Sequence, residues 1–363
     1  MKSWNHLYEA MLAEETRRTA VHKVCLGRKK IKRLQKYASD ENKTADKAIE
    51  WIEHYKNANH TPIQIYDGIT RKKRTIIVPT FKELTVQHCA VIALKPMFMH
   101  GMYEHSYASI PGRGAHKAKK AIEKWIRNDT KNVKYVLKMD IRHFFESIPH
   151  DILKRKLAEH IHDEKMLAIL YEIVSISDKG LPLGFYTSQW LSNWYLEGLD
   201  HYIKEKLRAA HYVRYMDDMV VFGSNKRQLH EMRQKIEKYL NTMLGLKLKN
   251  NWQVFRFDYV RNGKHYGRDL DFMGFRFFHD RVALRRTIML KATRKAKKIS
   301  KKDKATIHDI RQMLSYLGWI DATNTYSMYQ KRIKPMVNFQ HFKRRISSYD
   351  KKGARNEYCL CAS

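Results

Sequence analysis

Two short apolar runs flank a pair of acidic residues in the middle of the chain. Residues 211–215 and 219–222 are rich in β-branched and aromatic side chains, and a Gly-Ser-Asn sequence follows at residues 223–225. Such runs, separated by a short polar segment, predict a β-hairpin with Asp217 and Asp218 at its tip. Adjacent like charges are unfavourable there unless a cation lies beside them, and a divalent metal would make the pair a phosphate-binding site. The alternative is an ordinary polar turn.

A third carboxylate follows another apolar run. The composition of residues 135–141 predicts a largely buried strand with Asp140 at its end, and residues 152–161 predict a helix after it. An acid at a strand end beside a hairpin with two more is the arrangement that two-metal phosphoryl transfer needs, with ions about 3.5–4 Å apart. Mg²⁺ takes only one or two protein carboxylates plus substrate phosphates, so three aspartates suffice.

Helical periodicity dominates both ends of the chain. Residues 1–60 are mostly helical in pattern and carry basic patches, including one at residues 27–33. Beyond residue 280, a Lys-rich segment at residues 291–298 precedes an amphipathic helix. A basic helix with an amphipathic partner suits contact with phosphates, and a solvated helix face is the alternative. The apolar positions of the second helix are Ile307, Ile310, Met313, Leu314, Leu317 and Ile320.

The charge balance of the chain indicates a polyanionic partner. Lys and Arg total 71 of the 363 residues against 37 Asp and Glu, which gives a net charge of +34. Such an excess favours nucleic acid over an anionic membrane surface, because no apolar stretch approaches the roughly 20 residues that span a bilayer. A hydrophobic content of 43% excludes a disordered basic tail as the whole molecule.

The four cysteines predict neither a zinc site nor a disulfide framework. Cys359 and Cys361 are close together but lack a matching second pair, and Cys25 and Cys89 stand alone. The 19 histidines show no recognisable ligand spacing. Reduced thiols are expected, together with a cytoplasmic location, because no basic-then-apolar signal opens the chain.

Five segments of the chain resemble the motifs of reverse transcriptases, in the order of that family. Residues 134–149 resemble motif A, residues 180–193 resemble motif B, and residues 215–218 resemble the Tyr-x-Asp-Asp sequence of motif C. Residues 244–250 look like motif D, and residues 270–277 look like the primer grip. The resemblance covers roughly residues 70–335.

The resemblance implies a fold of the α+β class, a right-hand polymerase in which an antiparallel palm sheet packs on helices. The implied parts are an N-terminal helical basic extension (1–60), fingers (61–134), a palm (135–278, with part of the fingers around 150–185), a helical thumb (279–345) and a tail (346–363).

The motif B segment resembles one subclass of the family, the enzymes of diversity-generating retroelements. Most reverse transcriptases have Gln-Gly-x-x-x-Ser-Pro here, whereas this chain has Leu183 and Gln189 in place of the Gln and the Pro. Residues 245–254 and 106–116 strengthen the match. The resemblance implies error-prone copying of a template-repeat RNA opposite adenine, after which the altered cDNA replaces part of a target gene (mutagenic retrohoming). It also implies a small, basic, oligomeric accessory protein as partner.

The catalytic residues follow from the same resemblance. Asp140, Asp217 and Asp218 would be the catalytic acids of an RNA-directed DNA polymerase that uses two Mg²⁺ ions. Asp140 and Asp217 would ligate both ions, Asp218 would complete the site, and the backbone carbonyl of Ile141 would add a ligand. The motif D lysines, Lys247 and Lys249, are alternative proton donors to the pyrophosphate leaving group.

The nucleotide-binding residues are also implied by the family pattern. Phe145 aligns with the aromatic steric gate that excludes a ribose 2′-oxygen, while Phe144 is expected in the core. Leu183 offers only apolar contact where a Gln would hydrogen-bond the nucleotide, so Leu183→Gln is expected to raise fidelity; the alternative is that Leu183 merely packs. The remaining candidates are Arg74, Gly184, Ser188 and Gln189 for the nucleotide, and Met273 and Gly274 for the primer grip.

Two other functions fit parts of this pattern. A retron or group II intron reverse transcriptase is the nearest, but those enzymes keep Ser-Pro in motif B, and no His/Asn endonuclease motif appears at the C-terminus. A non-catalytic RNA-binding protein on the same fold is the second. The acidic cluster of Asp140, Asp217 and Asp218 argues against it, because such a cluster is destabilising without metal.

Overall fold

The computed structural model describes residues 3–26, 31–66 and 73–360, and the chain divides into two compact units. The first unit comprises Met1–Ala118 and Lys131–Phe255, and the second comprises Lys119–Thr130 and Arg256–Ser363. The basic run at residues 27–30, the pair Arg71-Lys72 and Cys361 lie outside the described residues.

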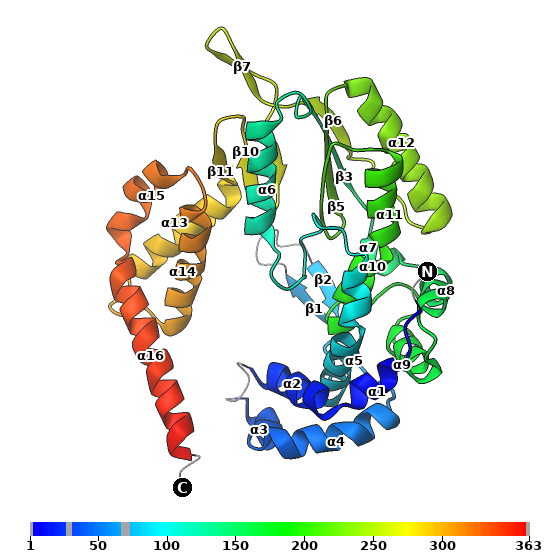
Figure 1. Cartoon of the computed structure of the whole chain (residues 1–363). Helices are drawn as coiled ribbons and strands as arrows, with labels where there is room; N and C mark the ends of the chain where they lie inside the picture. Colours follow the sequence, from blue (N-terminus) through cyan, green and yellow to red (C-terminus); the bar gives the residue numbers. More distant parts are fainter. Residues whose placement is uncertain (1–2, 27–30, 67–72, 361–363) are drawn as a thin grey trace. The chain divides into compact units, whose positions relative to one another are not determined.

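The N-terminal part of the first unit is helical, as the sequence predicts. Helices α1 (Leu7–Leu12), α2 (Glu14–Cys25), α3 (Lys32–Ala38) and α4 (Glu41–Glu53) pack around α5 (Phe81–His100) (Figure 1). Helix α5 starts at a capping box in which Thr80 and Glu83 satisfy each other's backbone N–H groups. Buried apolar side chains on several sides of α5, including Val86, Ala90 and Leu94, make it the centre of this layer.

A four-stranded sheet forms the middle of the first unit. Its strand order is β4 (His211–Tyr215), β5 (Asp218–Gly223), β3 (Tyr135–Asp140) and β6 (Gln253–Arg256). Strands β4 and β5 form the predicted hairpin, and β3 pairs antiparallel with β5. Helix α12 (Lys226–Met243) packs on β3 and β5. The central strand β5 is buried from Met219 to Phe222, which explains the continuous apolar run in the sequence.

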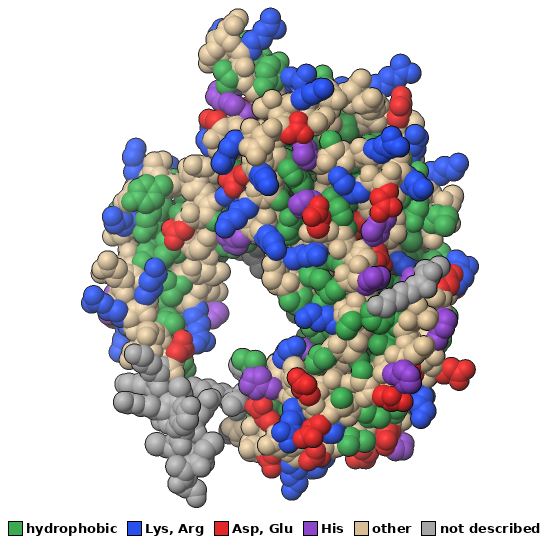
Figure 2. Space-filling view, viewed as in Figure 1, with side chains coloured by type: hydrophobic (Ala, Val, Ile, Leu, Met, Phe, Trp, Pro, Cys, Tyr) green, Lys and Arg blue, Asp and Glu red, His purple; other side chains and the backbone are tan. Residues whose placement is uncertain are grey.

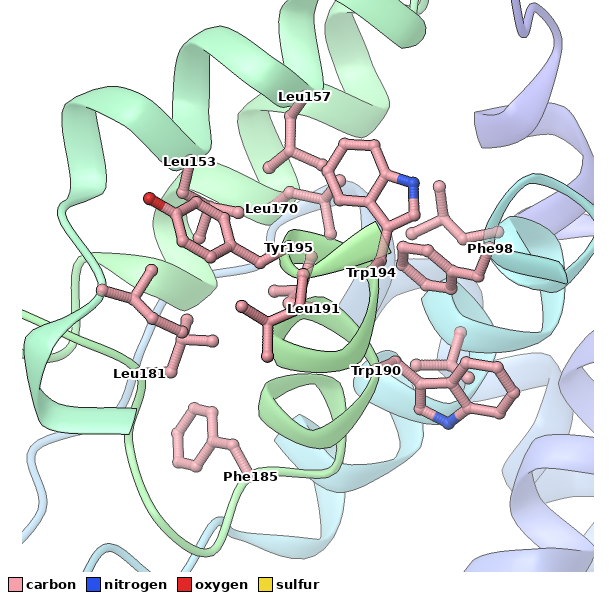
Figure 3. Close-up of a cluster of buried hydrophobic side chains, with 14 of the residues drawn as sticks. Phe98, Leu153, Leu157, Leu170, Leu181, Phe185, Trp190, Leu191, Trp194 and Tyr195 are labelled. Atoms are coloured by element: carbon pink, nitrogen blue, oxygen red, sulfur yellow. The ribbon is translucent and has the colours of Figure 1, made fainter. Parts of the chain in front are cut away.

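The apolar core of the first unit surrounds helix α10 (Tyr186–Tyr195). Figure 3 shows Trp190, Leu191, Trp194 and Tyr195 of this helix among side chains from neighbouring helices. These helices are α5, α8 (His150–His160) and α9 (Glu164–Val174), and the short helices α7 (Phe144–Ser147) and α11 (Glu197–His201) lie nearby in the chain. Trp194 is 1% exposed, so this packing holds α10 rigidly.

A separate β-hairpin of the first unit is hydrogen-bonded, at the end of its second strand, to the loop that precedes α10. Strands β1 (Ile63–Tyr66) and β2 (Lys73–Ile76) pair antiparallel and are exposed. Just after β2, the Ile77 N–H donates to the Leu183 carbonyl at 2.8 Å.

The second unit combines two small sheets with helices. Strands β7 (Tyr259–Arg261) and β8 (Lys264–Tyr266) form a hairpin, and β9 (Leu270–Phe272), β10 (Phe275–Phe277) and β11 (Val282–Leu284) form an antiparallel sheet. The helices are α13 (Arg286–Ser300), α14 (Ile307–Asp321), α15 (Tyr326–Arg332) and α16 (Phe339–Leu360), with most of α6 (Ala115–Asn128).

The predicted amphipathic helix is confirmed as α14. Ile310, Met313, Leu317 and Ile320 are buried against α13 and α16, while Ile307 and Leu314 are partly buried. Residues 346–360 continue helix α16, where the sequence suggested only a tail. None of the helices in the described part of the chain has the length and apolar character needed to cross a bilayer. Lys and Arg side chains are spread over the visible face of both units (Figure 2).

Candidate active site

Three aspartates meet at one end of the four-stranded sheet. Asp140 ends β3 and Asp218 begins β5, and the two are direct partners in the antiparallel register. Opposed residues on paired strands have Cα atoms about 4.5–5.5 Å apart and side chains on the same face. Asp217 lies in the turn between β4 and β5, and its carbonyl accepts the Ile141 N–H at 3.3 Å. The structure therefore brings Asp140, Ile141, Asp217 and Asp218 together.

The turn that carries Asp217 is held in an unusual backbone conformation. Tyr215 and Asp218 are register partners, so Met216 and Asp217 form a two-residue turn, and Met216 has a φ of 58°. A left-handed conformation is costly for a non-Gly residue and persists only where neighbours fix it. Here Arg214 Nη1 donates to the Met216 carbonyl at 3.1 Å, and the Ser192 hydroxyl lies 3.4 Å from the Met216 sulfur.

Arg214 belongs to a buried ionic network beneath this turn. Its guanidinium contacts the Asp200 carboxylate, with Nη2 to Oδ2 at 2.6 Å, and both side chains are 0% exposed. It also donates to the Asn193 side chain at 3.1 Å, and the Tyr212 hydroxyl donates to Asp200 at 2.8 Å. The network thus ties the turn to α10 and α11. The only trace of this network in the sequence is the charged Arg214 within the apolar β4 run.

The structure distinguishes between the two motif D lysines. Lys249 Nζ donates to Asp140 Oδ1 at 2.6 Å, and the Lys249 backbone N–H donates to the Asp140 carbonyl at 2.8 Å. Lys247 is exposed, and its carbonyl accepts the Arg142 N–H at 2.8 Å. Lys249 is therefore the lysine in contact with the acidic group.

A second lysine at the site was not anticipated. Lys138 Nζ lies 3.9 Å from Asp218 Oδ2. Side chains alternate along a strand, so Lys138 and Asp140 share one face of β3. This two-residue spacing is the signal in the sequence that places Lys138 beside the acidic group.

Asp217 is the carboxyl group of the site whose pKa is clearly raised. Burial, together with the charge of Asp140, raises the pKa of Asp217 to about 6. A carboxyl group with such a pKa takes up a proton near neutrality unless a cation is close.

The donors at this end of the sheet fit a hard divalent cation. Three carboxylates and the Ile141 carbonyl supply only oxygen, which Mg²⁺ and similar ions prefer. Asp140 faces Lys249 here, and the ligand oxygens of the three aspartates are not all within 4.8 Å of one another. A divalent ion would take over the neutralisation that Lys249 provides to Asp140.

Phe144 and Phe145 differ in burial, and the core position expected for Phe144 is confirmed. Phe144 is 3% exposed and packs in the core, whereas Phe145 is partly buried against it. The Phe145 carbonyl accepts the Leu181 N–H at 2.6 Å, which joins α7 to the loop before α10. The carbonyl also lies 2.4 Å from where a Cβ at Gly180 would stand, so only glycine fits there.

The loop before α10 presents Leu183 and Gly184. Leu183 is half-buried and Gly184 is exposed with a φ of 111°. A Cβ on Gly184 would lie 2.1 Å from the Ile77 carbonyl. A contact with a nucleotide is therefore not needed to explain a glycine at position 184, because the Ile77 backbone already requires one.

Ser188 and Gln189 lie within α10, which begins two residues before Ser188, at Tyr186. Ser188 is buried, and its hydroxyl donates to the Pro182 carbonyl at 2.8 Å, so it closes the preceding loop. Gln189 is exposed.

Arg74 is exposed on β2, opposite Ile65 of β1. In the second unit, Met273 and Gly274 form the two-residue turn between β9 and β10, with φ values of 52° and 88°. Positive φ at both positions is typical of a type I′ hairpin turn. A Cβ on Gly274 would lie 2.8 Å from Ile288 Cδ1, so packing against Ile288 explains why this position is a glycine.

Curated proteins similar to this chain include reverse transcriptases. "Protein YkfC" of Escherichia coli (strain K12) is 21% identical over 236 residues, which cover 53% of this chain and 61% of that protein. The retron Ec73 reverse transcriptase of Escherichia coli is 29% identical over 177 residues, covering 44% of this chain and 52% of its own. The group II intron-encoded protein LtrA of Lactococcus lactis subsp. cremoris is 25% identical over 144 residues, covering 37% and 23%. The chain thus spans less than two thirds of the length of these relatives.

Among solved structures, the apo telomerase of Candida tropicalis is similar to this chain with a TM-score of 0.48 and 12% identity, covering 77% of this chain and 60% of that one. The telomerase of Candida albicans in complex with a fragment of telomeric RNA has a TM-score of 0.45 and 13% identity, covering 86% and 62%.

A family model described as "Reverse transcriptase (RNA-dependent DNA polymerase)" matches residues 58–277, which is more than half of the chain. The matched region contains the three aspartates, the turn that carries Asp217, and Lys249. The chain belongs to the reverse transcriptase family.

Proposed function

We propose that this protein is an RNA-directed DNA polymerase whose catalytic group is Asp140, Asp217 and Asp218. The observation that carries the proposal is the pairing of Asp140 with Asp218 across β3 and β5, with Asp217 in the adjoining turn. Membership of the family, across residues 58–277, supports it.

In the proposed mechanism, Asp140 and Asp217 would hold two Mg²⁺ ions, and Asp218 and the Ile141 carbonyl would complete the site. When bound, the ions would lower the pKa of the primer 3′-hydroxyl and hold the nucleoside triphosphate. Lys249, rather than Lys247, is the proposed proton donor to the pyrophosphate, because its ammonium group lies 2.6 Å from Asp140. Its release from Asp140 on metal binding would free it for that role.

The nucleotide subsite is proposed to lie along α7 and the loop before α10. Phe145 would exclude a ribose 2′-oxygen, and its position is supported by the bond between its carbonyl and the Leu181 N–H. Leu183, Gly184 and Gln189 would border the base pair, with Ser188 holding the loop through Pro182. Arg74, on the hairpin whose end bonds to Leu183, would contact the triphosphate.

The proposed parts follow the right-hand polymerase plan. Residues 61–134 would form the fingers, residues 135–278 the palm and residues 279–345 the thumb, with Met273-Gly274 as primer grip. The β4-β5-β3-β6 sheet, with α12 packed on β3 and β5, supports the palm assignment. The substrates would be dNTPs and an RNA template with its growing cDNA.

We further propose the diversity-generating subclass, on the strength of Leu183 and Gln189 in motif B. An apolar contact discriminates a mispair from a correct pair less sharply than a hydrogen bond does. The half-buried Leu183 side chain, in a loop fixed by Ile77, supports a direct effect on fidelity. The partners would then be a template-repeat RNA and a small, basic accessory protein.

The test is cDNA synthesis on a defined RNA containing all four bases, with Mg²⁺ and dNTPs, followed by sequencing of the products. The control is the Asp217→Ala/Asp218→Ala protein. Products from the wild type alone, with errors concentrated opposite adenine, would support both assignments. Accurate products would keep the polymerase and reject the mutagenic subclass. Equal products from wild type and control would reject the aspartates as the catalytic group.

The same experiment on Leu183→Gln tests the role of that residue. We expect fewer errors opposite adenine with little change in the amount of product. An unchanged error spectrum would leave Leu183 as a packing residue.

A further inference from the structure

The second unit contains a group of potential metal ligands that the polymerase function does not use. Asp258, His265 and His279 each offer one ligand atom, and the three atoms lie within 4.8 Å of one another. They come from three segments: Asp258 precedes β7, His265 lies in β8, and His279 follows β10. Among the described residues, this is the one group of three or more Asp, Glu, His or Cys with that proximity.

Two imidazoles converge on the two oxygens of a single carboxylate. His265 Nδ1 lies 3.4 Å from Asp258 Oδ1, and His279 Nδ1 lies 2.6 Å from Asp258 Oδ2. The His279 backbone N–H also donates to Oδ2 at 3.0 Å, and the two rings lie 5.3 Å apart between centroids. Asp258 is 7% exposed, while the side chains of His265 and His279 are 50% and 33% exposed.

The backbone holds these three segments in place without a ligand. The Asp258 N–H donates to the Arg268 carbonyl at 3.0 Å, which closes the base of the β7–β8 hairpin. Tyr259 and Tyr266 stack across the hairpin with centroids 5.7 Å apart. The Phe278 N–H donates to the Arg281 carbonyl at 2.9 Å and closes the turn that carries His279. A preorganised set of donors loses little entropy when it binds.

The chemistry of the set selects the kind of ion. Two imidazole nitrogens and one carboxylate oxygen suit Zn²⁺ and neighbouring transition metals, whereas Mg²⁺ prefers oxygen alone. Ligand atoms in a tetrahedral Zn²⁺ site lie about 3.3 Å apart, given bonds of about 2.0–2.1 Å. The distance from His265 to Asp258 already matches this value. The shorter distance from His279 to Asp258, 2.6 Å, is that of a hydrogen bond, which the bonds to an ion would replace.

The fourth ligand of such a site would come from Asp280 or from solvent. Asp280 Oδ1 lies 3.8 Å from His279 Nδ1, and its side chain is 44% exposed. Three protein ligands with one open position are typical of zinc sites that keep a water molecule.

The rival explanation is a hydrogen-bonded Asp-His-His network with no ion. In such a network the two oxygens of Asp258 face His265 Nδ1, His279 Nδ1 and the His279 backbone N–H. Buried charged groups are paired with an opposite charge or coordinate a metal, and a divalent cation held by the carboxylate and both rings satisfies this requirement directly.

We propose that Asp258, His265 and His279 form a transition-metal site, of the Zn²⁺ class, that fastens the β7–β8 hairpin to the turn between β10 and β11. The ion stabilises the projecting hairpin (Figure 1), which carries Arg261 and Lys264. The site is chemically distinct from the all-oxygen aspartate group.

The test is metal binding by the full chain after treatment with a chelator. Zn²⁺ is titrated in competition with a chromophoric chelator, and Co²⁺ is titrated while visible absorbance is recorded. We expect one tight equivalent and a Co²⁺ band of a nitrogen-ligated site. His265→Ala and His279→Ala should each weaken binding by at least the 10–100-fold typical of lost supporting residues in metal sites.

The matched control is His308→Ala, which removes an exposed histidine from α14 of the same unit. It should bind like the wild type, and Zn²⁺ should raise the melting temperature of the wild type and of this control but not of His265→Ala. His265 is half-exposed, so this variant folds even if His279→Ala does not. No tight equivalent in the wild type, or equal binding by all variants, would overturn the proposal.

Discussion

At the scale of single residues, the structure identifies Lys249 as the motif D lysine that contacts Asp140. Residues 247 and 249 are both lysines on the same segment, and no local pattern separates them. The fold does so, because the backbone bond from Lys249 to Asp140 fixes which lysine reaches the acid.

We expect Lys249→Ala to lower the rate of nucleotide addition by about 100-fold or more, in the range of general acid catalysis. Lys247→Ala is the matched control and should change it less than about 3-fold. Single-turnover primer extension at saturating dNTP measures both. Equal effects of the two substitutions would remove Lys249 from the proposed role.

The raised pKa of Asp217 should make the stability of the metal-free protein depend on pH. Its folded-state pKa of about 6 lies above the unfolded value of about 3.9, so folding favours the protonated form. Stability without metal should therefore fall as the pH rises from about 4 through about 6.

Asp217→Asn removes this titration, and the variant should gain up to about 1–2 kcal/mol over the wild type between pH 4.5 and pH 7.5. Urea unfolding with chelator present measures the difference. In millimolar Mg²⁺ the gain should shrink, because the ion stabilises the charged wild type. A gain that does not depend on pH would contradict the assignment.

At the scale of elements, the sequence predicts those helices and strands that a regular pattern of apolar residues marks. The β4–β5 hairpin, β3 and α14 came from apolar runs or helical spacing, which local physics determines. The Arg214 network and the Asp258 group follow no periodic pattern, because their members lie on different strands, helices and turns and meet only through tertiary packing.

The buried pair of Arg214 and Asp200 fixes the turn between β4 and β5 from below. Arg214→Met or Asp200→Asn alone should destabilise the protein by about 3–5 kcal/mol, since each leaves a buried group without its partner. The double variant should lose less than the sum of the two. Urea unfolding of the four proteins gives the coupling, and strict additivity would show that the pair does not act as a unit.

Gly184 lies where the loop before α10 meets the end of β2. Two glycine substitutions separate the effect of its close contact with Ile77 from the cost of a positive φ. Gly184→Ala meets the Ile77 carbonyl, whereas Gly112→Ala, also at positive φ (72°), meets no atom within 4 Å. Gly112→Ala should cost about 1–2 kcal/mol from conformation alone.

Gly184→Ala should cost more and should raise the KM for dNTPs, because the loop must move away from Ile77. Thermal unfolding and steady-state primer extension measure the two effects. Equal stability losses for both variants would show that the contact with Ile77 carries no weight.

At the scale of the whole molecule, the net charge of +34 predicts RNA binding that depends steeply on salt. Each phosphate contact releases counterions, so the logarithm of affinity falls by about 0.7 per contact for single strands as the logarithm of salt rises. On α13, Lys297 and Lys298 are exposed, whereas Lys295 Nζ bonds to the Asp309 carboxylate at 2.7 Å.

Lys297→Ala/Lys298→Ala should therefore flatten the salt slope by about 1–1.5 and weaken RNA binding alike for all sequences. Lys295→Ala should leave the slope unchanged and lower the melting temperature instead, since its partner is the buried Asp309. Fluorescence anisotropy from 50 to 300 mM salt separates the two outcomes. An unchanged slope in the double variant would place the phosphate contacts on other basic surfaces and leave these lysines as a solvated helix face.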